Sequence, residues 1–445
     1  MSSSDVEIHE IAGYSNDAIS TFFQMLKQKQ LAYENADEHE NVELPKVLLN
    51  LGCLDELLDD DDQNYVSIMN GLESVADSGI VWGVRFDGSF LDSSISRGDL
   101  DRMTNTIASI PSLTKIEWDV ERDHEIEHED YIEIVTNMLL RTSSLETLEC
   151  NGLRLAETPN EIENFADSIR GTTTLKEVKF TGGLFNSSCW TIQNVGQVLE
   201  SLAALPHLKK LSLVGMVLKR PSSIDSLSST NSSFLKIFDH PGLKTFHLPS
   251  TYWVDDTILH SISSGLLTSP AISDLSLVTP LGANECHLLS EIIRCNHVLN
   301  ALRLYTPCIG QYCHVLPIID ALEANTTLRT LLIATMDFQS GVPFFYDSDT
   351  HEAFLSMIQQ KNYALAGLRF LSFDVQAPST QNHLVDHEIN KKIAFYAKLN
   401  LEGRKDLLRT STASIDLLAE YLISNSDDLD ILFYYLSMVP GLLFG

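Results

Sequence analysis

The 445-residue sequence is short of basic residues: it has 30 Lys and Arg against 61 Asp and Glu, a formal net charge of −31 at pH 7. Phosphate contacts need a basic footprint, so this balance argues against a nucleic-acid-binding protein. Adsorption to an anionic membrane surface is disfavoured for the same reason. An acidic chain of this kind instead favours solubility and selects basic partners.

Long hydrophobic runs are also missing, so we predict no membrane-spanning segment. The first ten residues, MSSSDVEIHE, have neither the basic nor the apolar region of a secretory signal. The seven cysteines are an odd, scattered set without a CxxC pair, which is typical of reduced intracellular thiols. We therefore predict a cytoplasmic protein without disulfides.

Catalytic motifs are scarce as well: G-x-x-x-x-G-K-[ST], G-x-S-x-G and G-x-G-x-x-G do not occur. One segment, HEIEH, places His124 and His128 four residues apart, and on a helix they could bind zinc with Glu125 as general base. Its neighbours are carboxylates, Glu127 is charged where metalloproteases have an uncharged residue, and no third ligand is identifiable. We favour a solvated acidic loop and expect no enzyme, metal or cofactor, with a zinc-dependent hydrolase as the alternative.

Three other segments contain metal-ligand residue types. Cys286 and His287 lie 27 residues, one repeat period, before Cys313 and His314. Zinc ligands must converge on one ion, whereas equivalent positions on neighbouring helices lie roughly 10 Å apart, so we expect buried cysteines and partly exposed histidines. The run DDDDQ from Asp59 begins like a calcium loop but lacks its central Gly and terminal Glu.

An internal repeat dominates the rest of the sequence. Six-residue units with apolar residues at positions one, four and six recur, as in LKKLSL and LETLEC. Ten copies begin at residues 81, 113, 145, 175, 208, 243, 272, 299, 328 and 368. The alternation predicts a short strand with one buried face, and helical patterns such as EIENFADSIRG lie between the copies. A strand and a helix about every thirty residues bury their apolar faces only by stacking.

This pattern resembles the leucine-rich repeat family, in its ribonuclease-inhibitor-like subclass. The resemblance implies a right-handed α/β solenoid (horseshoe) over residues 79–390, with the parallel sheet on the concave side and helices on the convex side. It also implies protein binding on the concave face. The sequence departs from the family pattern at the ninth position, where Asn or Cys is rare, so we expect looser turns after the strands.

The two flanks differ from the repeats. Residues 1–78 combine amphipathic stretches with acidic linkers, and we predict an N-terminal helical cap. Residues 391–445 are too apolar to lie in solvent and are predicted to form a C-terminal helical cap. The YAKLNLEGRKDLL and LFYYLSMVP segments resemble the tail of uncharacterised leucine-rich repeat proteins of diatoms, which implies no activity.

Charge within the repeats is opposite in sign to the rest of the chain. The third and fifth residues of each copy point onto the inner face, and the second lies at the rim. These thirty positions have a net charge of +5, which leaves −36 on the other 415 residues. The acidic members are Glu117, Glu146, Glu149, Glu177 and Asp274. The basic members are Arg85, Lys115, Lys176, Lys179, Lys209, Lys210, Lys244, Arg303, Arg329 and Arg369.

We interpret this surface as a recognition strip, basic in the middle copies and more apolar towards the C-terminal ones. A structural alternative is that the stems of rim cations simply cover apolar surface. The candidate protein-binding residues are Lys179, Lys210, Arg303, Arg329, Tyr305, Leu332 and Phe370. The favoured function is a protein-interaction module or scaffold, whose partner has a local acidic patch. A further alternative is the substrate-recognition subunit of a ubiquitin ligase, although no ligase-docking motif is apparent in residues 1–78.

Overall fold

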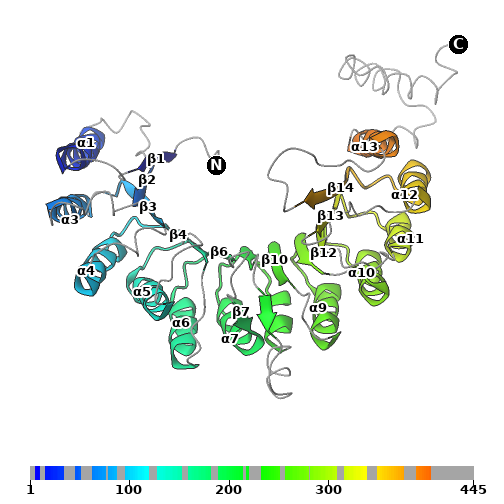
Figure 1. Cartoon of the computed structure of the whole chain (residues 1–445), viewed down its shortest axis with the longest axis horizontal. Coiled ribbons are helices and arrows are strands. Elements are labelled where there is room, and N and C mark those ends of the chain that lie inside the picture. Colours follow the sequence, from blue (N-terminus) through cyan, green and yellow to red (C-terminus); the bar gives the residue numbers. More distant parts are fainter. Residues whose placement is uncertain are drawn as a thin grey trace, which may run out of the picture. The chain divides into compact units, whose positions relative to one another are not determined.

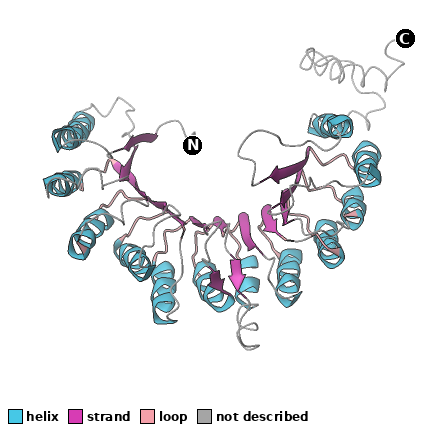
Figure 2. Ribbon diagram, viewed as in Figure 1, coloured by secondary structure: helices cyan, strands magenta, loops and turns pink. Residues whose placement is uncertain are grey.

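The computed structural model describes most of the repeat region. The described residues are 6–10, 16–34, 46–51, 63–76, 79–87, 96–119, 128–152, 159–181, 189–213, 217–219, 232–250, 256–279, 281–307, 315–337, 348–374 and 387–401. The chain divides into two compact units, residues 1–265 and 266–445. Each unit is a parallel sheet covered by helices (Figures 1 and 2).

The first unit contains a sheet whose spatial order is β1-β2-β3-β4-β5-β6-β8-β10. These strands are β1 (Val6–Glu10), β2 (Lys46–Leu51), β3 (Val81–Asp87), β4 (Lys115–Asp119), β5 (Thr147–Asn151), β6 (Glu177–Thr181), β8 (Lys210–Ser212) and β10 (Thr245–Ser250). All neighbouring pairs are parallel. Two short strands, β7 (Cys189–Thr191) and β9 (Val217–Lys219), pair with each other beside the end of β10.

Helices connect successive strands of this unit and pack side by side on one face of the sheet (Figure 1). They are α1 (Asn16–Glu34), α3 (Gln63–Val75), α4 (Arg97–Ala108), α5 (His128–Arg141), α6 (Pro159–Gly171) and α7 (Ile192–Ala203), followed by α9 (Asp256–Thr268) at the division between the units. Residues 232–238, which precede β10, are also helical. The helix α3 approaches α1 closely at Gly71, because a β-carbon there would lie 2.0 Å from the ring of Phe23. A larger residue at this position would push the two helices apart.

The second unit repeats the same arrangement with strand order β11-β12-β13-β14, all parallel. Its strands are β11 (Asp274–Val278), β12 (Ala301–Pro307), β13 (Thr330–Asp337) and β14 (Gly367–Asp374). Its helices are α10 (Ala283–Cys295), α11 (Leu316–Ala324), α12 (Ser348–Gln360) and α13 (His387–Leu401), each packed on the next. The predicted α/β solenoid repeat fold, with parallel strands alternating with helices, is confirmed.

The repeated leucines form the core. In the copy that begins at Leu208, the side chains of Leu208, Leu211 and Leu213 are 0%, 0% and 1% exposed. Burying one leucine side chain completely stabilises the folded state by about 1.5–3 kcal/mol, so three per copy are a large part of what orders each repeat. At position six of two earlier copies, Phe86 and Trp118 are buried and stack with ring centroids 4.0 Å apart.

In most copies a buried polar residue lies in the turn from the helix to the next strand, three positions before the first apolar residue; Ile110 and Leu205 take this position in two copies of the first unit. In the second unit this residue is Asn296, Asn325 or Asn362. The Asn362 amide donates to the carbonyls of Leu322 and Asn325 at 2.6 and 3.1 Å. Its oxygen accepts the backbone N–H groups of residues 364 and 365 at 2.9 and 2.7 Å. The side chain therefore joins one turn to the turn before it.

Other residue types serve the same purpose in the first unit. The ring of His240 lies 2.7 Å from the carbonyl of Leu205 through Nε2, and its Nδ1 accepts the N–H of Gly242 at 3.1 Å. The Thr172 hydroxyl lies 3.3 Å from the carbonyl of Leu139 in the preceding copy and 2.9 Å from that of Ser168 in its own helix. The looser turns expected after the strands fall largely outside the described residues, whereas these helix-to-strand turns are tightly hydrogen-bonded.

The structure describes parts of both predicted flanks, residues 1–78 and residues 391–445. Residues 1–78 include β1 and β2, which pair in parallel with the sheet and are followed by helices. This segment therefore contributes two further strand–helix units instead of a purely helical cap. At the other end, α13 packs on α12, and Asn400 donates to the carbonyls of Asn362 and Leu365. Residues 402–445 lie outside the described part of the chain.

Candidate binding surface

The sheet face away from the helices is the surface on which the sequence places its candidate residues (Figure 2). Side chains alternate along each strand: in β4, β5 and β6 the second and fourth residues are buried, and the first, third and fifth are not. Because the strands are in register, outward side chains of neighbouring copies stand side by side.

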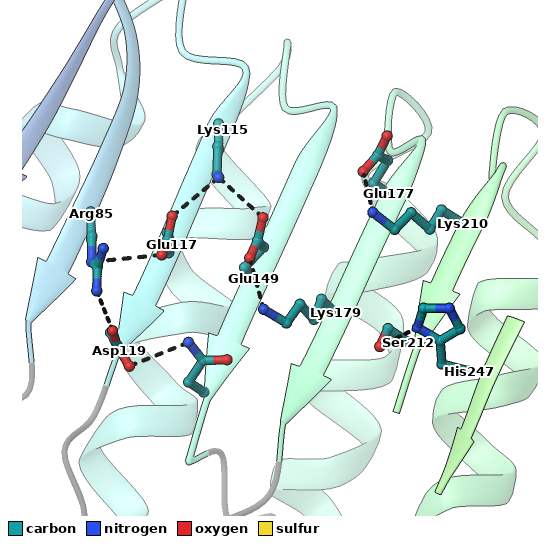
Figure 3. A network of polar contacts seen from close by, with 11 residues as sticks. Arg85, Lys115, Glu117, Asp119, Glu149, Glu177, Lys179, Lys210, Ser212 and His247 are labelled. Atoms are coloured by element: carbon teal, nitrogen blue, oxygen red, sulfur yellow. Dashed lines mark hydrogen bonds and ion pairs between the residues drawn. The ribbon is translucent and has the colours of Figure 1, made fainter. Parts of the chain in front are cut away.

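Over β3 to β6 these side chains form a continuous chain of ion pairs (Figure 3). Arg85 contacts Asp119 and lies 3.6 Å from Glu117. Lys115 joins the carboxylates of Glu117 and Glu149, at 3.1 Å each. Glu149 in turn lies 3.3 Å from Lys179. Arg85, Glu117, Lys115 and Glu149 thus each contact two charges of the opposite sign.

Burial and charge act in opposite directions at the centre of this chain. Burial, the largest single effect, disfavours the charged forms of both Glu149 and Lys115. The opposite charges outweigh it: Lys115 and Lys179 lower the pKa of Glu149, while Glu149 and Glu117 raise the pKa of Lys115. Both groups are therefore held in their ionised forms near neutral pH.

The ion pairs become more exposed towards β8. The side chains of Lys115 and Glu117 are 18% and 14% exposed, whereas those of Lys210 and Glu177 are 46% and 50% exposed. Lys210 and Glu177 are 3.5 Å apart. Exposed ion pairs of this kind contribute about 0–1 kcal/mol to folding stability because solvent screens them. The side chains of Lys210 and Glu177 can therefore leave each other for a binding partner at little energetic cost.

These contacts change the predicted basic strip. All five acidic residues counted on the inner face and rim pair with counted basic residues, since Lys176 contacts Glu146 and Arg303 contacts Asp274. The candidates Lys179, Lys210 and Arg303 are therefore present on the surface as members of ion pairs rather than as isolated cations. The surface is a mosaic of both signs with a small positive excess.

In the second unit, the candidate residues are arranged around the Arg303–Asp274 pair. Tyr305 on β12 and Leu332 on β13 are partly exposed on the outward face. Arg329 lies at the rim and donates to the carbonyl of residue 364 at 3.2 Å. This part of the surface therefore offers an aromatic ring and an apolar side chain beside a paired guanidinium.

Phe370 was predicted on the same face, and the strand register contradicts this placement. In the β13–β14 pair Phe370 lies opposite Ile333, which is fully buried, and Arg369 lies opposite Leu332. The last copy therefore begins at Leu365, three residues earlier than predicted. In this register Phe370 occupies a strand position whose side chains point into the core, and Arg369 occupies one whose side chains point outward. The side chain of Phe370 itself lies outside the described part of the structure.

One contact on this face was not predicted from the sequence: it joins Ser212 on β8 to His247 on β10 (Figure 3). Nδ1 of His247 lies 3.3 Å from the Ser212 hydroxyl, which is on a residue only 2% exposed. The strand register, which places Ser212 opposite His247, could have predicted this pair. A nucleophilic serine must be reachable by substrate, and this one is not.

The predicted metal-ligand segments are separate in the structure or lie outside its described part. Cys286 is buried and His287 is exposed, as expected, with His287 3.8 Å from Glu291. Cys313, His314, Asp59, His124 and Glu125 lie outside the described residues. Within the described ranges, no group of three or more His, Cys, Asp or Glu side chains is placed to hold a metal. No helix in this part of the chain is long and apolar enough to cross a membrane.

Comparisons with known proteins assign the chain to no family. No protein-family model matches the chain, and no curated protein matches it. Among solved structures, a match is the "Leiomodin-1 Actin-Binding Site 2 (ABS2)", at 13% identity and a TM-score of 0.29, covering 42% of this chain and 94% of that one. The repeating strand–helix units in a parallel sheet are what a leucine-rich repeat solenoid requires.

Proposed function

We propose that the chain is a protein-binding module of the ribonuclease-inhibitor-like leucine-rich repeat kind, and that its partner docks on the sheet face away from the helices. The observation that carries this proposal is the dense, partly exposed array of charged side chains on neighbouring strands of the first unit. In-register strands hold these groups at fixed spacings. A rigid array of this kind offers a partner several polar contacts at little conformational cost.

The mixed signs of the array favour a partner with complementary mixed charge and a local acidic patch. Charges arranged in this way contribute more to specificity and association rate than to affinity. In the second unit, Tyr305 and Leu332 are the residues best suited to be apolar anchors, because aromatic side chains among neutral neighbours are frequent binding hot spots. The proposed function involves no catalysis.

Site-specific photo-crosslinking tests this proposal. A photoreactive amino acid replaces Thr147 on β5 or Thr330 on β13, both uncharged outward residues, so that no ion pair is lost. Matched controls carry it at Asn164 on α6 and Ser356 on α12, which are exposed on the helix side. Expression in the native host should give one discrete crosslinked species from the sheet-face positions only. Equal crosslinking from the helix positions would contradict the proposal.

A further inference from the structure

Three polar side chains stand side by side on the sheet face, at the carboxyl ends of β4, β5 and β6. They are Asp119, Asn151 and Thr181, which are successive cross-strand partners and are here called the acceptor row. Each is partly exposed and follows a buried residue on its strand, so each belongs to the outward face. Neighbouring strands lie about 4.8 Å apart, which sets the spacing of the row.

Two oxygens of this row have unused capacity to accept hydrogen bonds. The amide nitrogen of Asn151 donates to Oδ1 of Asp119 at 3.3 Å, so the amide oxygen of Asn151 points away from Asp119. Among the described residues, neither this oxygen nor the hydroxyl oxygen of Thr181 has a hydrogen-bond partner, although both atoms are buried. Buried polar atoms without a partner are rare in folded proteins, because each one lowers stability.

The group that these two oxygens lack is a hydrogen-bond donor. Arg85 and Lys179 on the same face do not supply it, because they pair with the carboxylates of Asp119 and Glu149. Asn151 and Thr181 are themselves only partly buried. Rotation of the Asn151 amide and of the Thr181 hydroxyl therefore presents both oxygens to a donor that arrives from outside the chain.

The charge of the surrounding surface favours a donor with a positive charge. The described outward side chains of β3 to β6 include three basic and four acidic residues, so their net charge is −1. The basic residues are Arg85, Lys115 and Lys179, and the acidic residues are Glu117, Asp119, Glu149 and Glu177. One added positive charge makes this region neutral.

We propose that the acceptor row binds a lysine side chain of the protein partner, an inference that rests on the proposed protein-binding function. A lysine ammonium has three N–H donors and no acceptor, which matches one carboxylate, one amide oxygen and one hydroxyl oxygen. Two tetrahedral N–H···O bonds of about 2.8 Å span about 4.6 Å, close to the strand spacing between Asn151 and Thr181. The acidic patch proposed for the same partner faces the exposed Lys210 on β8, so the two contacts occupy different places.

The test titrates the full chain into two peptides, one of eight lysines and one of eight trimethyllysines, each labelled with fluorescein at its N-terminus. Fluorescence anisotropy measures Kd. The peptides have the same charge, but trimethyllysine has no N–H to donate. The variant Asn151→Leu with Thr181→Val removes both oxygens without changing the net charge. The matched control, Asn164→Leu with Thr106→Val, makes the same changes on α6 and α4. Circular dichroism verifies that both variants are folded.

We expect the wild-type chain to bind the lysine peptide about tenfold more tightly than the trimethyllysine peptide, a difference of about 1.4 kcal/mol. The variant should bind the two peptides equally, and the control should keep the tenfold preference. Equal Kd values for the wild-type chain would overturn the inference and leave the two oxygens to bound water. Loss of the preference in both the variant and the control, or in neither, would overturn it as well.

Two single substitutions test the same point if the double variant does not fold. Thr181→Ser keeps the hydroxyl oxygen and should keep the preference for the lysine peptide, whereas Thr181→Val should reduce it about threefold. The same preference in both single variants would contradict a bond to the Thr181 hydroxyl.

Failure of this inference can be separated from failure of the proposed function. The preference for the lysine peptide depends on the acceptor row alone, whereas the crosslinking from Thr147 and Thr330 depends on any partner that docks on the sheet face. Discrete sheet-face crosslinks without this preference would keep the function and remove the lysine contact. A preference that depends on Asn151 and Thr181, without sheet-face crosslinks, would keep the lysine site and contradict the proposed function.

Discussion

Replacing Asn362 with alanine should destabilise the second unit strongly. The Asn362 side chain is 1% exposed and makes four hydrogen bonds to backbone groups of its own turn and the preceding one. Alanine leaves two buried N–H groups and two carbonyls without this partner. Each unsatisfied buried group costs about 1–3 kcal/mol, part of which relaxation recovers, so we expect a total loss of about 2–4 kcal/mol.

The assay combines urea unfolding with native-state hydrogen exchange. Repeat arrays open locally, so exchange at the amides of Ala364 and Leu365, which donate to Asn362, reports the affected turn directly. The matched control is Asn300→Ala, an exposed asparagine in the same unit, which should change stability by less than about 0.5 kcal/mol. Equal effects of the two substitutions would refute the structural role of the buried asparagines.

Three further predictions concern single groups. Because the folded-state pKa of Glu149 is below its ordinary value of 4.5, its ion pairs should contribute stability above that pH and lose it as the pH falls through the folded value. The urea-measured stability difference between wild type and Glu149→Gln should therefore shrink between pH 7 and pH 3, and a constant difference would contradict the ion-pair account. The substitution His240→Asn should lower the free energy of unfolding by less than about 1 kcal/mol, whereas His240→Ala should lower it by about 2 kcal/mol, because only asparagine can again donate and accept hydrogen bonds in the turn. Equal decreases in the thermal unfolding temperature of the two variants would contradict this role of His240. Burial raises the pKa of the Cys286 thiol to about 12, so iodoacetamide at pH 8 should alkylate exposed Cys295 and leave Cys286 unmodified in the native chain, as judged by peptide mapping.

The repeat frame could be predicted from the sequence because its apolar spacing has a direct physical cause. Residues one, four and six of a copy are all buried, so their identity is restricted in every copy. The last copy was misplaced because LAGLRF and LRFLSF both satisfy the same spacing. The buried asparagine supplies the missing signal: Asn296, Asn325 and Asn362 each stand three residues before the first leucine of a copy, which selects Leu365.

The upstream units were harder to predict. β1 and β2 are separated from their neighbours by acidic segments longer than the usual turns, and these obscure the repeat period. The strand register could not be derived from the apolar pattern alone there, since β2 and β3 have an irregularity between Val47 and Leu48. Their place in the sheet follows only from three-dimensional pairing.

The sequence predicted which charged residues lie on the binding surface, but not which of them pair with one another. A count of charges gives the positive excess, yet it ignores which residues face each other across strands. Once the register is applied, Lys179 stands opposite Glu149, and Lys210 stands opposite Glu177. Cross-strand pairing is thus what converts a predicted basic strip into a mosaic of ion pairs.

The central claim is that a partner binds the sheet face. Its most direct test is to purify the partner identified by crosslinking and to label the lysines of this chain in its presence and in its absence. Mass spectrometry would measure acetylation of Lys179 and Lys210 on the sheet face, and of Lys236 and Lys361 on the helix side. The account predicts that the partner protects the two sheet-face lysines and leaves the two helix-side lysines unchanged. Protection of the helix-side lysines with unchanged labelling of Lys179 and Lys210 would contradict it.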